Sequence, residues 1–199
     1  MSWKRLVGAD RSGPPPPETL AGAPWNPWTI PNAIAAARII GIPIFLYLVL
    51  SSDDGHNVAA AVVYGVIGWS DYFDGFVARL TGQYSRLGAL MDPIADRGLA
   101  LAGMFVSWRF ELLPRWAVAL VLLREALMLV IGQWTLRKGV ELRINWAGRL
   151  GVAPILAAPF WAMVEVQWVA LTFLYSGMVL SFYASFLYAR DARRQLRAQ

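Results

Sequence analysis

The chain reads SDYFDGFVAR over residues 70–79 and SRLGALMDPIAD over residues 85–96, which places four aspartates close together in a strongly apolar sequence. Hydrophobic residues make up 57% of the 199 residues, and charged residues only 16%. Carboxylates are costly to keep in such surroundings, and in membrane proteins they usually belong to a functional site. These two segments therefore predict where the site lies and, through their spacing, which helices hold it.

Both segments have the spacing of a helix face. Counted from the first aspartate, a stripe at offsets 3, 4, 7 and 8 joins Asp71, Asp74, Gly75, Ala78 and Arg79. A second stripe, at steps of 3, 4 and 4 residues, joins Ser85, Gly88, Asp92 and Asp96. A turn at residues 81–83 separates the stripes, so they can face one another. The sequence thus predicts four carboxylates around one cavity.

Six apolar stretches have the roughly 20 residues that a membrane-spanning helix requires. They cover residues 30–50, 57–80, 85–108, 116–136, 146–164 and 167–188. The expected fold is an all-α, polytopic integral membrane protein with six transmembrane helices in one domain, residues 30–189. Residues 1–29, with four consecutive prolines and a Trp-Asn-Pro-Trp segment, are predicted to be a flexible tail and interfacial segment. Residues 190–199 are predicted to be a basic cytoplasmic tail.

The distribution of Lys and Arg predicts the orientation in the membrane. Most of them fall at the chain ends and in the loops of one side, whereas the opposite loops hold only Arg109 and Arg115, among acidic residues. The positive-inside rule therefore predicts that both termini and the aspartates are on the cytoplasmic side of the cell membrane. Because the basic residues lie between apolar spans, the net charge of +5 indicates contact with anionic membrane lipids and not with nucleic acid.

The aspartates predict a metal site. Like charges at low dielectric need compensation, and a divalent cation is the usual one. The chain has no cysteine, and its one histidine, His56, lies in a predicted outer loop. An all-oxygen site favours Mg²⁺ or Mn²⁺, and two such ions can hold a diphosphate and stabilise its leaving group. Asp96, at the end of the series, is the candidate general base for an acceptor hydroxyl.

The pattern D-x2-D-G-x2-A-R-x8-G-x3-D-x3-D resembles the signature of the CDP-alcohol phosphotransferases (phosphatidyltransferases), membrane enzymes of phospholipid synthesis. The resemblance extends more loosely from Pro31, Asn32 and Arg38 to Arg149. It implies that metals bind the diphosphate of CDP-diacylglycerol, that an acceptor hydroxyl attacks the phosphorus bearing diacylglycerol, and that CMP leaves. It also implies a homodimer.

The resemblance assigns roles residue by residue. The metal ligands match Asp71, Asp74, Asp92 and Asp96, of which the last is also credited with proton removal. The candidate CDP-diacylglycerol contacts are Asn32, Gly75, Ala78, Arg79, Ser85 and Gly88. Gly75 and Ala78 leave space for the nucleotide diphosphate to approach the backbone, and Arg79 can contact a phosphate oxygen.

The acceptor is predicted from the branch that the motifs resemble, which makes phosphatidylglycerophosphate or cardiolipin. Glycerol 3-phosphate is the first expectation, and its phosphate needs additional cations, for which the candidates are Arg124, Arg137, Lys138, Arg143 and Arg149. Phosphatidylglycerol, the acceptor of a cardiolipin synthase, is the alternative. Arg149 is followed by Leu-Gly and not by a second basic residue, which departs from the glycerophosphate branch.

Two other function classes also place carboxylates in membranes. Intramembrane prenyltransferases use Asp-rich motifs and Mg²⁺ to bind a diphosphate, but their motifs are widely separated in the chain. An ion transporter uses carboxylates along its path, but those are spread over several spans. Because the aspartates here cluster on two adjacent predicted helices, both alternatives rank below the phosphatidyltransferase.

Overall fold

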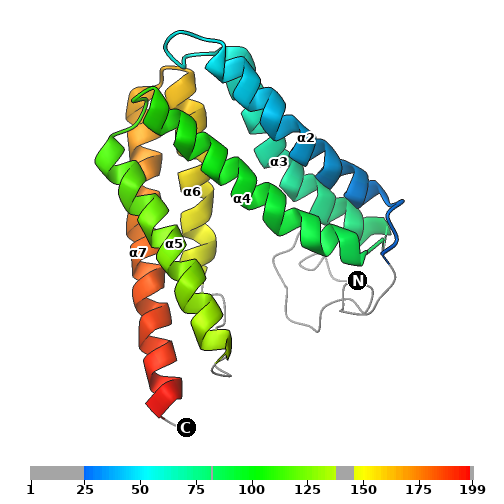
Figure 1. The fold of residues 1–199 in the computed structure, drawn as a ribbon, viewed down its shortest axis with the longest axis vertical. Coiled ribbons are helices and arrows are strands. Elements are labelled where there is room, and N and C mark those ends of the chain that lie inside the picture. Colours follow the sequence, from blue (N-terminus) through cyan, green and yellow to red (C-terminus); the bar gives the residue numbers. More distant parts are fainter. Residues whose placement is uncertain (1–24, 82, 138–145, 198–199) are drawn as a thin grey trace. The chain divides into compact units, whose positions relative to one another are not determined.

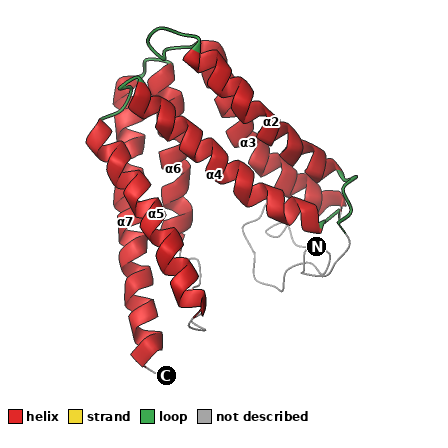
Figure 2. Ribbon diagram, viewed as in Figure 1, coloured by secondary structure: helices red, strands yellow, loops and turns green. Residues whose placement is uncertain are grey.

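The computed structural model describes residues 25–81, 83–137 and 146–197. All regular structure in these ranges is helical, as Figures 1 and 2 show. The six described helices are α2 (Ile30–Leu50), α3 (Val58–Thr81), α4 (Arg86–Arg109), α5 (Arg115–Arg137), α6 (Trp146–Met163) and α7 (Gln167–Arg197). The predicted all-α fold is therefore confirmed for these residues. The predicted proline-rich tail falls almost wholly on residues 1–24, outside the described ranges.

The predicted segments agree with the helix bounds, with one exception. The last helix, α7, does not end near Tyr188 but continues to Arg197. Its final residues, ARDARRQLR, are mostly good helix formers, so hydrophobicity marks the end of the apolar segment and not the end of the helix. Residues 190–197 thus extend α7.

Three of the described helices are long and apolar enough to cross a membrane by length and composition. These segments are Ile30–Leu50 in α2, Arg115–Gln133 in α5 and Gln167–Asp191 in α7. This number applies only to the residues whose side chains the structure describes, and within them α3 and α4 carry the charged motif. The structure thus supports an all-helical membrane protein.

The chain divides into two compact units, and the first consists of Met1–Ser51 and Ala59–Ala102. It contains α2, nearly all of α3 and most of α4 (Figure 1). Glycines lie where these helices meet: a Cβ on Gly41 would be 2.8 Å from Cδ1 of Ile67, and one on Gly98 would be 3.1 Å from Cδ1 of Ile42. Small residues allow the backbones to approach closely. Side chains from all three helices can therefore reach a common point.

The start of α4 is capped by Ser85. Its hydroxyl accepts a hydrogen bond from the Gly88 N–H at 2.9 Å, and its carbonyl accepts one from the Ala89 N–H at 3.2 Å. This arrangement pairs a donor that would otherwise be unpaired in the first helical turn. The cap at Ser85 thus fixes where α4 begins.

The second unit consists of Ser52–Val58 and Gly103–Gln199. Here α6 and α7 pack with their backbones in contact: a Cβ on Gly177 would lie 3.0 Å from the backbone nitrogen of Ile155. The two helices are joined by a tight turn in which Glu165 has a φ of 62°. The Val166 N–H donates to the Trp161 carbonyl at 3.0 Å, which closes the helix end as in a Schellman motif.

Candidate functional site

Arg38 connects the three helices of the first unit. Its guanidinium donates to Oδ1 of Asp71 on α3 at 2.9 Å and to Oδ1 of Asp96 on α4. The Arg38 side chain is only 2% exposed, whereas those of Asp71 and Asp96 are 48% and 47% exposed. The site therefore combines a buried cation with two carboxylates that remain accessible.

The structure brings together two of the four predicted metal ligands. Asp71 and Asp96 meet at Arg38, as the facing stripes predicted. Asp92 lies one turn before Asp96 on α4 and is partly exposed. Asp74 lies on α3 one turn after Asp71, but its side chain is outside the described part of the structure. Among the described side chains, no group of three or more acidic, histidine or cysteine residues is placed to hold a metal ion.

The donor chemistry of the site nevertheless fits a hard divalent cation. The carboxylates of Asp71 and Asp96 converge on a positive group and are about half accessible. Carboxylate oxygens are the ligands that Mg²⁺ and Mn²⁺ prefer. A cation that approaches the exposed oxygens would thus meet the type of ligand it needs.

Three of the predicted nucleotide-binding residues contact one another. Ser85 donates from Oγ to Oδ1 of Asn32 at 2.7 Å, and Asn32 donates from Nδ2 to the carbonyls of Asn26 and Pro27 at 2.9 and 3.1 Å. Asn32 is 4% exposed and Ser85 is 5% exposed. A Cβ on Gly88 would lie only 2.7 Å from Oδ1 of Asn32. These residues therefore form a buried, hydrogen-bonded contact between the starts of α2 and α4.

The other predicted nucleotide contacts lie on α3. Ala78 is partly exposed, in keeping with its place on the same stripe as Asp71. Gly75 and Arg79 belong to the helix, but their side-chain surroundings are outside the described part of the structure. Their roles stay predictions.

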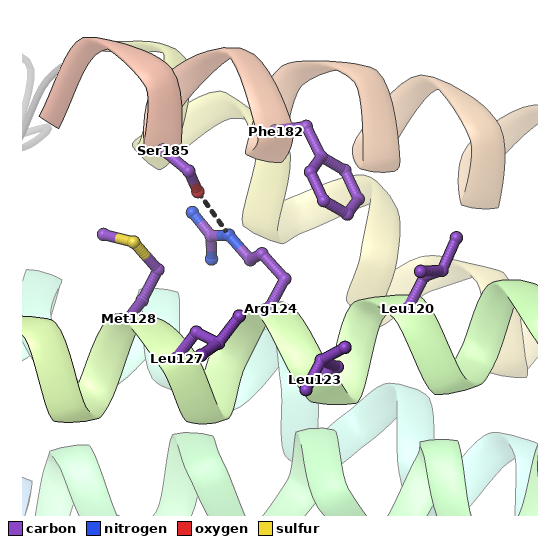
Figure 3. A pocket seen from close by; sticks show the side chains of 7 residues that line it. All are labelled: Leu120, Leu123, Arg124, Leu127, Met128, Phe182 and Ser185. Carbon is purple, nitrogen blue, oxygen red and sulfur yellow. Dashed lines mark hydrogen bonds between the residues drawn. The ribbon is translucent and has the colours of Figure 1, made fainter. Parts of the chain in front are cut away.

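Arg124, the predicted acceptor contact on α5, belongs to the second unit. Its Nε donates to Oγ of Ser185 at 2.9 Å and its Nη2 to the carbonyl of Ser181 at 3.2 Å, both on α7. It also pairs with Glu125, although neighbouring residues on a helix point about 100° apart. Figure 3 shows the guanidinium directed at Ser185 beside an apolar pocket of about 100 Å³ that α5 and α7 line. The Arg124 guanidinium is thus already engaged by protein groups.

The remaining predicted acceptor contacts are less defined. Arg137 ends α5 and Arg149 lies in α6, and the side chains of both are outside the described part of the structure. Lys138 and Arg143 lie wholly outside the described residues. Their part in acceptor binding stays a prediction.

Sequence reasoning gave Arg38 no role. The available signal was its isolation, because it is the only charged residue among the 21 residues of α2. A lone charge in an apolar helix requires a partner. The spacing that revealed the aspartate stripes lies within α3 and α4, so it could not identify a partner on a third helix.

The family model described as CDP-alcohol phosphatidyltransferase matches residues 28–183, a range that includes Arg38 and all four aspartates. The chain belongs to this family. The predicted enzyme class, a phosphatidyltransferase of phospholipid biosynthesis, is confirmed, and the prenyltransferase and transporter alternatives fall away.

Relatives of this phosphatidyltransferase carry two kinds of name. A cardiolipin synthase (CMP-forming) of Streptomyces coelicolor is 35% identical over 184 residues, which cover 85% of each chain. A putative cardiolipin synthase of Mycobacterium tuberculosis is 35% identical over 173 residues, or 81% of each chain. A CDP-diacylglycerol--glycerol-3-phosphate 3-phosphatidyltransferase of Escherichia coli is 27% identical over 183 residues, which cover 86% of this chain and 99% of the other.

Proposed function

We propose that the protein transfers the phosphatidyl group of CDP-diacylglycerol to a hydroxyl of a glycerol-type acceptor and releases CMP. The observation that carries this proposal is the convergence of Asp71 and Asp96 on Arg38, with both carboxylates still accessible. The family membership supports the same chemistry.

The proposed mechanism assigns Asp71, Asp74, Asp92 and Asp96 to the binding of Mg²⁺ or Mn²⁺. Two bound ions would neutralise the diphosphate and so stabilise the leaving CMP. Asp96 accepts the proton of the acceptor hydroxyl while the hydroxyl oxygen attacks the phosphorus that bears diacylglycerol. The bond between that phosphorus and the oxygen bridging to CMP then breaks. Gly75 and Ala78 leave room for the donor, and Arg79 contacts a phosphate oxygen.

Phosphatidylglycerol is the acceptor that the observations favour. The relatives named cardiolipin synthase are 35% identical, compared with 27–28% for those named after glycerol 3-phosphate. Arg124, one of the cations expected to hold a glycerophosphate, is engaged by Ser185, Ser181 and Glu125. Glycerol 3-phosphate, the first expectation from the sequence, is the second candidate, because relatives of that name align over 99% of their length.

The same proposal includes the arrangement in the membrane. Helices α3 and α4 have 24 residues each, which at 1.5 Å per residue is about 36 Å and enough to cross the roughly 30 Å apolar layer. With six spans and cytoplasmic termini, the aspartates lie on the cytoplasmic side of the membrane in this proposal. A homodimer is part of the proposal on the basis of the family resemblance.

The decisive experiment uses the purified protein in lipid nanodiscs with labelled CDP-diacylglycerol and Mn²⁺ or Mg²⁺. Glycerol 3-phosphate, phosphatidylglycerol, inositol phosphate and serine are offered separately, and CMP and the lipid product are measured. Labelled cardiolipin is the expected product, and phosphatidylglycerophosphate would reverse the order of the two acceptors. If no acceptor and neither metal yields CMP, the proposed reaction is wrong.

Asp96→Asn tests the assigned base in the same assay. Because a positioned general base contributes about 10²–10⁴-fold, CMP release is expected to fall by at least about a hundredfold. Asp191→Asn is the matched control, since Asp191 forms an exposed pair with its neighbour Arg190. Activity of Asp96→Asn near the level of this control would exclude Asp96 as the base.

A further inference from the structure

The burial of Arg38 is unusual for a charged side chain. It is 2% exposed and lies near the middle of α2, which carries no other charge. A buried charge is tolerated when it is paired and hydrogen-bonded, and removal of one partner leaves the other uncompensated. The contacts with Asp71 and Asp96 are therefore a condition for the packing of α2 in this unit.

The two carboxylates also depend on Arg38. Asp71 is on α3 and Asp96 is on α4, and the Oδ1 of each accepts a hydrogen bond from the same guanidinium. Without a cation between them, two like charges drawn together by helix packing would repel each other. Arg38 thus sets both the distance between these carboxylates and the charge of their surroundings.

We propose that Arg38 is a positioning residue that serves as the built-in counter-ion of the aspartate site. It stabilises the site when no metal is bound, and it weakens metal binding because it shares the same carboxylates. This inference rests on the proposed function only in taking the aspartates as metal ligands. A ligand that binds the folded state stabilises it by an amount set by its concentration and dissociation constant, so melting experiments report both effects.

The test compares wild type, Arg38→Gln, Arg38→Lys and Arg115→Gln, each as the full chain in nanodiscs. Arg115 is the matched control because its pair with Glu111 is exposed and contributes little. Thermal unfolding is followed with and without Mn²⁺, and Mn²⁺ affinity is measured from the spectrum of the free ion. Neither measurement needs substrate, so both are independent of CMP release.

Arg38→Gln is expected to melt at a lower temperature than wild type without metal and to show a larger rise when Mn²⁺ is added. Its Mn²⁺ affinity should increase by about tenfold or more, because one nearby positive charge is gone. Arg38→Lys keeps the charge and should bind Mn²⁺ within about threefold of wild type. Arg115→Gln should match wild type in both measurements.

Three results would overturn the inference. The first is an Arg38→Gln variant with wild-type or weaker Mn²⁺ affinity, and the second is a wild-type protein that shows no Mn²⁺ effect. The third result applies if Arg38→Gln does not fold under any condition, when Arg38→Lys becomes the deciding variant. The inference is then wrong if Arg38→Lys binds Mn²⁺ about tenfold more tightly than wild type, which is the increase expected for Arg38→Gln. In each case the proposed transfer reaction is still judged separately, on CMP release with Mg²⁺.

Discussion

Replacement of Ser85 by alanine separates a structural role from a substrate-binding role. The hydroxyl both caps α4 through the Gly88 N–H and donates to the buried Oδ1 of Asn32. Loss of a serine cap costs about 0.5–2 kcal/mol. An acceptor left buried without a partner costs about 1–3 kcal/mol more, and the Asn32 side chain has little access to water.

The two contributions together predict a loss of about 1.5–5 kcal/mol in the free energy of unfolding. For a chain of this size each kcal/mol lowers Tm by about 2–4 °C, so Ser85→Ala should melt about 3–20 °C below wild type. The 10 tryptophans give a strong intrinsic fluorescence signal for thermal unfolding in nanodiscs.

Ser107→Ala is the matched control on the same helix. Its hydroxyl is buried and donates to the carbonyl of Gly103 at 2.8 Å. Because this carbonyl lies within α4 and also accepts a backbone hydrogen bond of the helix, loss of the hydroxyl does not leave it unpaired. Its Tm should stay within about 4 °C of wild type, as expected for a loss below about 1 kcal/mol. The reasoning would be refuted if Ser85→Ala melted like Ser107→Ala while CMP release collapsed, because Ser85 would then act on the substrate.

Two further predictions concern the second unit. Gly177→Ala should lower the free energy of unfolding by about 1–3 kcal/mol, because the new methyl would press on the backbone of Ile155. In the control Gly132→Ala the new methyl meets no atom within 4 Å, so the free energy of unfolding should stay unchanged or rise by up to about 1 kcal/mol. Equal effects of the two substitutions in thermal unfolding would contradict the close α6–α7 contact. Glu165→Gly should raise the free energy of unfolding by about 0.5–1 kcal/mol, because glycine adopts the positive φ at this turn without steric cost, and a lower Tm would show that the glutamate side chain stabilises the turn.

The helices and the proximity of Asp71 and Asp96 could be predicted because both depend on local spacing, whereas their shared partner Arg38 could not. Intervals of three and four residues placed Asp71 and Asp96 on facing stripes, and a short turn made the stripes adjacent. The 53-residue separation of Asn32 and Ser85 offers no such period, so their hydrogen bond could not be predicted. Arg124 shows a different limit, because its long side chain pairs with Glu125 despite the angle between them.

The end of α7 could not be predicted from the apolar span that ends at Tyr188. Apolar composition indicates contact with lipid, whereas helix formation depends on backbone propensity. After Tyr188 the apolar segment ends but the helix continues. Helices α3 and α4 are long but carry the charged motif, so apolar composition alone does not identify them as spans.

The position of Arg38 also has a consequence for biogenesis. Its partners follow it by 33 and 58 residues, so α2 is synthesised and reaches the membrane before Asp96 has left the ribosome. An arginine at the centre of an isolated span costs about 2.5–3.5 kcal/mol during insertion, which the otherwise uncharged α2 must offset with its apolar residues alone. Assembly of the first unit is therefore completed only when α4 arrives, and truncated chains that end before Asp96 should be the ones that membrane quality control removes.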